Sequence, residues 1–178
     1  MISPLLSVLD QLVDSRPQPW SLVDVHAALP QVLGACARMS LSDPVVPYGR
    51  YLLHLDGAGR YNVQLDVFSP EYVGGIHCHG SWGIFTVLRG TLYAEEFDPG
   101  ASLRTRVGAY APGSGAGFAS PDDWHRVSTG AGPQVVSIHV YGAGFDLDEG
   151  EAIGAGGERV RYRRSPFGHP FAIRGLFR

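Results

Sequence analysis

The residues best suited to chemistry are two histidines that stand one position apart, His77 and His79. They lie in the stretch Gly75–Gly90, whose β-branched and aromatic residues favour a strand. On a strand, residues i and i+2 face the same side, so both imidazoles should project together while Cys78 faces the other way. Two converging imidazoles can form half of a metal site. The pair alone is equally compatible with surface histidines or with hydrogen-bonded core histidines.

A second stretch, Gly115–His125, supplies a third candidate histidine at its end. The two stretches together resemble the two signatures of cupins, which are jelly-roll barrels that supply H-x-H, usually a carboxylate, and a later histidine. Here the carboxylate position of the first signature holds Gly83, and the second signature is one residue short before its histidine. The resemblance implies a metal site of His77, His79 and His125 without a protein carboxylate.

A site of three neutral imidazoles favours particular ligands. It leaves a divalent ion its full positive charge, which favours an anionic ligand, above all a thiolate. It also leaves coordination positions open, as the two-histidine-one-carboxylate iron oxygenases do. Two alternatives stay open at this point: a catalytic zinc ion with three histidine ligands, and a barrel that binds no metal.

The elements that must position these residues fall into two parts. Within residues 1–40, the leucine spacing predicts a helix over Pro4–Ser15, with Ser3 as its cap. A second helix should begin at Ser21, where Asp24 would complete a weak capping box. Pro30 should kink or divide this second helix.

From residue 45 onward the pattern changes to about ten short strands separated by glycine and proline turns. The main predicted strands are Tyr48–Leu55, Tyr61–Phe68, Thr91–Phe97, Thr105–Ala111, Gly115–Ala119, Arg126–Ser128 and Val135–Tyr141, with one or two more between Glu158 and Arg178. The glycine-rich Gly150–Gly157 is expected to be a loop. The prediction is a single mainly β domain over residues 1–178, a cupin (jelly-roll) β-barrel over 45–178 with two short N-terminal helices.

Composition narrows the possible partners. The formal net charge is -3 and no basic run is present, so nucleic acid is not expected as a partner. No apolar stretch approaches ~20 residues, so no membrane span is expected. The first residues do not read as a signal peptide, and two cysteines give no disulfide framework. We therefore expect a cytoplasmic protein that is a monomer or a weak homo-oligomer.

The motifs also resemble one narrower group, the thiol dioxygenase family of cysteine dioxygenase and 3-mercaptopropionate dioxygenase. The resemblance covers roughly Tyr48–Gly142 and rests on I-H-x-H-x-S-W-G with L-R-G, on H-R-V, and on S-I-H-V-Y-G. It implies that Fe(II) is bound by the three histidines, and that O2 converts a small thiol to a sulfinate. The implied partners are therefore a small-molecule thiol and O2.

The same resemblance implies a relay outside the metal ligands, made of Ser137, His139 and Tyr141. Strand alternation puts all three on one face, so His139 between two hydroxyls can orient the Tyr141 hydroxyl toward a ligand. The competing interpretation is a plain aromatic barrel strand. Three inward polar groups on such a strand would then need another reason, because buried polar groups require partners.

Arg50 matches the family position of the arginine that holds the substrate carboxylate, and a guanidinium can bind a carboxylate in bidentate fashion. Tyr48 is expected to line the same pocket, and Trp82 to pack at the barrel mouth or in the core. Without the resemblance, Arg50 would be read as a surface residue.

Two positions depart from the family pattern. Neither Gly83 nor Ile84 supplies the cysteine that crosslinks to tyrosine in mammalian-type enzymes, and Cys78 replaces the usual aspartate.

The expected function is O2-dependent oxidation of the sulfur of L-cysteine or a similar small thiol carboxylate. The alternatives are a cysteine-dioxygenase-like enzyme that forms a different oxidised sulfur product in secondary metabolism, and a non-oxygenase metal-binding cupin.

Overall fold

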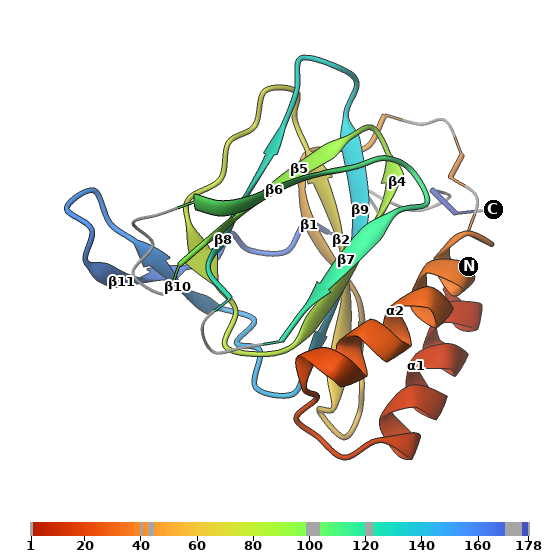
Figure 1. Ribbon diagram of the computed structural model, residues 1–178. Coiled ribbons are helices and arrows are strands. Elements are labelled where there is room, and N and C mark those ends of the chain that lie inside the picture. The colour runs from red at the N-terminus through yellow and green to blue at the C-terminus, as the bar shows by residue number, and fades with distance from the viewer. Residues whose placement is uncertain are drawn as a thin grey trace.

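The computed structural model describes residues 2–39, 41–42, 45–98, 104–119, 123–169 and 176–177. The chain begins with two helices, α1 (Ser3–Ser15) and α2 (Leu22–Cys36), and continues as antiparallel strands (Figure 1). The strands are β1 (Gly49–Leu55), β2 (Tyr61–Phe68), β3 (His77–Cys78), β4 (Gly83–Arg89), β5 (Leu92–Phe97), β6 (Arg104–Tyr110), β7 (Gly115–Phe118), β8 (His125–Thr129), β9 (Val135–Gly142), β10 (Glu149–Ile153) and β11 (Arg159–Arg163).

The strands form two sheets, one in the order β1-β2-β9-β4-β7 and the other in the order β11-β10-β3-β8-β5-β6. The prediction of a mainly β jelly roll with two N-terminal helices is confirmed. It needs one correction, because the described strands do not close into a continuous barrel. The inner faces of the two sheets can therefore line a site between them. The apolar side chains on each outer face must be shielded from water by other elements.

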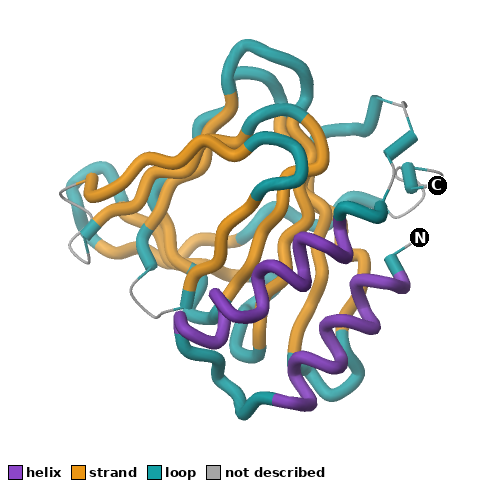
Figure 2. The backbone as a smooth tube through the Cα atoms, turned by 45° about the vertical axis from the view of Figure 1, so that its right-hand side comes forward, coloured by secondary structure: helices purple, strands orange, loops and turns teal. Residues whose placement is uncertain are grey.

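The helices cover the outer face of the five-stranded sheet (Figure 2). Side chains of β2 and β9 that point outward, including Leu65, Ile138 and Val140, are fully buried in one core with the apolar faces of both helices. The approach of α2 is close, because a Cβ built on Gly117 of β7 would overlap the Val25 side chain. This packing fixes the sheet from outside and leaves its inner face for the site.

The helix boundaries test three predictions. α1 begins at Ser3 itself, with Ile2 as an N-cap that makes no side-chain cap bond, so the prediction of a Ser3 cap is wrong. The capping box of α2 is confirmed, because the Asp24 N–H donates to the Ser21 hydroxyl and the Ser21 N–H donates to the Asp24 carboxylate. α2 continues through Pro30 without a break, since its face is held by the core on both sides of that residue.

The hairpin of β10 and β11 corrects half of the loop predicted over Gly150–Gly157: residues 150–153 belong to β10, and residues 154–157 form the turn of the hairpin. β10 pairs with β11 on one side and with β3 on the other, so Ala152 lies opposite His77. Main-chain pairing with two neighbours therefore overrides the glycine content.

Positions 170–175 and 178 of the predicted C-terminal strands lie outside the described residues. Neither described helix has both the length and the apolar character to cross a bilayer.

One charged network joins the β1–β2 turn to α1. The Asp56 carboxylate accepts hydrogen bonds from the backbone of Ala58 and Arg60 and from the Arg60 guanidinium, at 2.9–3.1 Å. Arg60 also pairs with Asp14 at 2.5 Å and with Asp10 at 3.3 Å, both on α1. These bonds lower the pKa of Asp56 to about 2, with the Arg60 side chain as the largest cause.

Candidate metal centre

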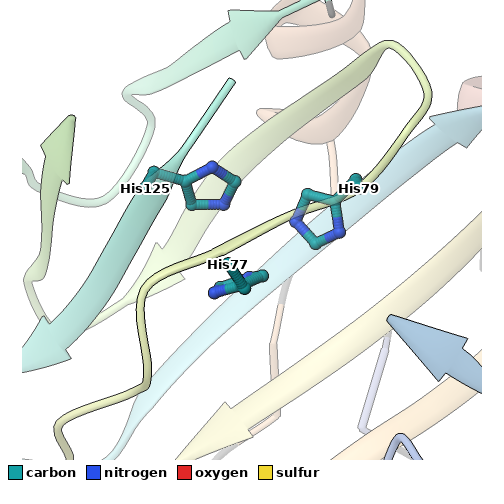
Figure 3. A group of neighbouring side chains, drawn as sticks. All are labelled: His77, His79 and His125. Carbon is teal, nitrogen blue, oxygen red and sulfur yellow. The ribbon is translucent and has the colours of Figure 1, made fainter. Parts of the chain in front are cut away.

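The structure brings His77, His79 and His125 together between the two sheets (Figure 3). One nitrogen of each ring lies within 4.8 Å of a nitrogen of the others. His77 and His125 are direct partners on the paired strands β3 and β8, and His79 follows two residues after His77. Cys78 is buried and is not part of the cluster, as strand alternation predicted. The spacing H-x-H therefore gives the expected convergence.

Hydrogen bonds to the backbone orient two of the rings. Nδ1 of His77 lies 2.9 Å from the carbonyl oxygen of Gly75, and Nδ1 of His125 lies 3.0 Å from that of Asp123. A carbonyl oxygen only accepts, so Nδ1 carries the proton in both rings and the lone pair is on Nε2. Among the described residues, Nδ1 of His79 is buried without a partner. The Nε2 lone pairs of His77 and His125 are thus already oriented, and the His79 imidazole lies beside them. This arrangement suits a divalent metal ion.

Burial keeps His77 and His79 neutral. It lowers the pKa of His77 to about 3, and it lowers the pKa of His79 well below its ordinary value. Repulsion between neighbouring imidazoles in their protonated forms adds to the shift at both residues. Neutral imidazole is the form that binds a metal, so these two rings can act as donors at neutral pH.

The absence of a carboxylate ligand at position 83 has a steric cause. Gly83 lies opposite Tyr141 and Phe118 on the inner face of the five-stranded sheet. A Cβ built on Gly83 would overlap the Phe118 ring, which stacks on His79 with ring centroids 5.3 Å apart. The space that a glutamate or a cysteine would need is therefore filled by an aromatic ring.

A row of hydrogen bonds on β9 lies beside the histidine cluster. Ser137 Oγ lies 2.8 Å from Nε2 of His139, and Tyr141 Oη lies 3.2 Å from Nδ1 of the same ring. The Tyr141 ring centroid lies 4.7 Å from that of His79. Burial lowers the pKa of His139 and raises the pKa of Tyr141 well above its ordinary value, so both groups are neutral at pH 7. The predicted row is present, with its phenol next to a candidate metal ligand.

Asp66 is a member of this row that the sequence prediction missed. It lies opposite Ser137 on β2, and its Oδ2 lies 3.5 Å from Nε2 of His139. Its Oδ1 is buried and has no hydrogen-bond partner among the described residues. Burial raises the pKa of this carboxyl, against the lowering effect of His139. The alternation of β2 could have revealed it, because Asn62 and Gln64 share its inner face.

Arg50 lines a cavity that the three histidines also line. Its Nε donates to the backbone oxygen of Ser165 at 2.5 Å, and its Nη2 donates to that of Leu147 at 2.6 Å. The guanidinium also lies 4.1 Å above the centroid of the Phe167 ring. Two carbonyl groups thus occupy Nε and one N–H of Nη2, and the N–H groups of Nη1 remain for an anion.

Two expected pocket residues do not line the cavity. Tyr48 precedes β1, is 59% exposed and is not among the residues that line the cavity. Trp82 points toward the helices, where it stacks on Trp20 at 4.2 Å and donates its indole N–H to Gln18. Neither residue lines the cavity, and Trp82 takes the core position that the sequence left as its alternative.

The cavity has a volume of about 790 Å³. Its wall combines the histidine cluster with aromatic rings and a few charged groups, including Phe68, Tyr72, Phe85, Phe118, Phe145, Arg50, Asp66 and Arg164. Such a cavity can hold a small anionic molecule against a cationic centre. Arg164 was not predicted, because it lies outside every motif of the sequence.

No family model matches the chain. A cupin 2 domain-containing protein from Halorhodospira halophila is 18% identical, with a TM-score of 0.48 over 61% of this chain and 72% of that one. The polyketide cyclase RemF from Streptomyces resistomycificus is 19% identical, with a TM-score of 0.44 over 61% and 77%. KdgF from a Halomonas species is 15% identical, with a TM-score of 0.42 over 52% and 76%. These similarities are too distant to indicate a function.

Proposed function

We propose that this protein is a mononuclear non-heme iron thiol dioxygenase that uses O2 to convert a small anionic thiol to its sulfinate. L-cysteine and related thiol carboxylates are the substrates that suit it best. The overall reaction adds both atoms of O2 to sulfur, so that a thiolate RS⁻ becomes RSO2⁻ without a further reductant.

The observation that carries the proposal is the cluster of three histidines, which has no carboxylate at position 83. His77, His79 and His125 supply three imidazole donors, and Phe118 fills the space at Gly83. A divalent ion there keeps its whole charge, which favours an anionic sulfur ligand over a neutral one. When bound, Fe(II) would supply the redox chemistry that O2 and a thiolate need in order to react.

The other residues then have defined tasks. The terminal nitrogens of Arg50 can bind the ligand carboxylate and so fix where its sulfur lies. The Tyr141 hydroxyl, held by His139, borders the position where the reacting atoms meet. The aromatic wall that includes Phe85 and Phe118 limits the water around them.

Metal content and O2 uptake on a panel of thiols test the proposal. We expect purified protein to hold about one iron per chain and to consume O2 only when a thiol carboxylate is present. The His125→Ala variant, which lacks one donor, should lose both properties. A folded protein that takes up no iron, or that consumes no O2 with any thiol, would contradict the proposal.

A further inference from the structure

A second arginine, Arg164, borders the same cavity as Arg50 and the histidines. It directly follows β11, and its backbone N–H donates to the carbonyl oxygen of Asp148. Its side-chain Nε donates to the backbone oxygens of Asp146 at 3.0 Å and Glu149 at 2.7 Å. Its Nη1 lies 3.3 Å from the Tyr162 hydroxyl. These bonds fix the guanidinium in one place.

Arg164 is separated from the metal centre by a single aromatic ring. Its guanidinium lies 4.4 Å from the centroid of Phe145. The Phe145 ring stacks on Tyr141 at 4.0 Å and lies 5.5 Å from the ring of His79. The guanidinium, the Phe145 ring and the His79 ring therefore form one continuous row of contacts along the cavity wall.

The two arginines hold the same backbone segment. Arg50 binds the carbonyl of Leu147, and Arg164 binds the carbonyls of Asp146 and Glu149 on either side of it. Arg50 also binds the carbonyl of Ser165, the residue after Arg164. After burial, repulsion from Arg164 is the largest cause that lowers the pKa of Arg50. Two like charges share one end of the cavity.

Each of the two guanidinium groups has a nitrogen that can still donate hydrogen bonds to a ligand. Within the part of the chain that the structure describes, Nη1 of Arg50 and Nη2 of Arg164 make no hydrogen bond to protein. The described side chains also place no carboxylate in an ion pair with either arginine, although Asp66 lies near enough to attract both. Like charges at a partly buried site are costly unless an anion binds between them.

We propose that Arg164 and Arg50 together bind the carboxylate of the ligand, through the guanidinium nitrogens that the backbone leaves unused. The ligand is then a small thiol that carries a carboxylate, and a neutral thiol of the same length binds weakly. This inference relies on the proposed function only in taking a thiol as the group that reaches the metal.

Binding to zinc-loaded protein tests the inference without any oxidation. Calorimetry compares 3-mercaptopropionate with 3-mercapto-1-propanol, which has the same thiol and chain but no charge. We expect the acid to bind at least tenfold more tightly than the alcohol, since charge-assisted bonds to two guanidiniums distinguish them. The Arg164→Gln variant should lose most of this preference, and so should Arg50→Gln. The matched control Arg163→Gln, at an exposed neighbouring position, should keep it.

The outcomes are distinguishable. An Arg164→Gln protein that prefers the acid as strongly as the wild type overturns the inference. If that variant does not fold, Arg164→Lys, which keeps the charge, should retain part of the preference, and complete loss or full retention there overturns it instead. A protein that shows the arginine-dependent preference but never consumes O2 would contradict the proposed function and leave this inference standing.

Discussion

At the scale of single residues, Gly83 determines what kind of metal centre this protein can form. Its missing side chain makes room for Phe118, whose ring stacks on His79. Any larger residue at position 83 must displace that ring. The donor set of three histidines is thus a consequence of packing as well as of residue type.

Gly83→Ala tests this packing. We expect the variant to lose about 1–3 kcal/mol of unfolding free energy, because an added methyl overlaps a packed ring. In a Gly83→Ala/Phe118→Leu double variant, the smaller leucine side chain leaves room for the methyl, so part of the lost unfolding free energy should return. Urea denaturation measures both. Gly34→Ala, in α2 with nothing within 4 Å of the new methyl, should be neutral or stabilising. Additive effects of the two changes at positions 83 and 118 would contradict the account.

Asp66 provides the second residue-scale prediction. Its carboxylate lies 3.5 Å from Nε2 of His139, so it helps to hold the ring that orients Tyr141. In Asp66→Asn we expect kcat for thiol-dependent O2 consumption to fall about tenfold, with iron content unchanged. Glu96→Gln removes another cavity carboxylate that pairs with Arg106 and should leave kcat as it is. An equal fall in kcat in both variants would indicate a general effect of cavity charge, and it would contradict a role of Asp66 in positioning the His139 ring.

The sequence predicts some of these residues and not others, for physical reasons. His77 and His79 are recognisable because a period of two on a strand determines the face that each side chain takes. Trp82 could be assigned only to the barrel mouth or the core, because it stands just before β4, where alternation does not yet define a face. Arg164 was missed because its position depends on hydrogen bonds to a distant backbone segment, which no local pattern encodes.

At the scale of elements, alternation along β2 and β9 is the main determinant of the site. Residues such as Leu65 and Ile138 bind the sheet to the helices, while Asp66 and His139 face the cavity from the same strands. β2 has the bounds that its pattern predicts, Tyr61–Phe68. β10 was predicted as a loop, because its pairing with β3 and β11 is a long-range property.

The β1–β2 turn gives a prediction about pH. Its Asp56 has a pKa lowered from 3.8 to about 2, so its ionised form stabilises the folded state above about pH 4. That contribution should disappear as the pH falls from about 4 toward 2, and it amounts to about 1–2 kcal/mol after allowance for solvent around Arg60. Urea titrations of wild type and Asp56→Asn should show a difference in stability at pH ~6 that shrinks by pH ~2.5. A difference independent of pH would contradict this role.

At the scale of the whole molecule, the site depends on segments that lie far apart in the chain. β3, β8 and β9 bring the histidines and the hydroxyl row together, while the segment after β11 adds Arg164. The helices take no direct part in the histidine cluster and instead fix the outer face of the sheet. The fold class was predictable from the order of patterns along the chain, whereas the cavity wall required the two sheets to be placed face to face.

The central claim is that a three-histidine centre joins O2 to a thiol sulfur. Mass spectrometry of the product formed under ¹⁸O2 by iron-loaded protein tests it most directly, with L-cysteine and 3-mercaptopropionate as substrates. We expect a sulfinate in which both oxygen atoms carry the label. A product without label, or a disulfide as the only thiol product, would contradict it.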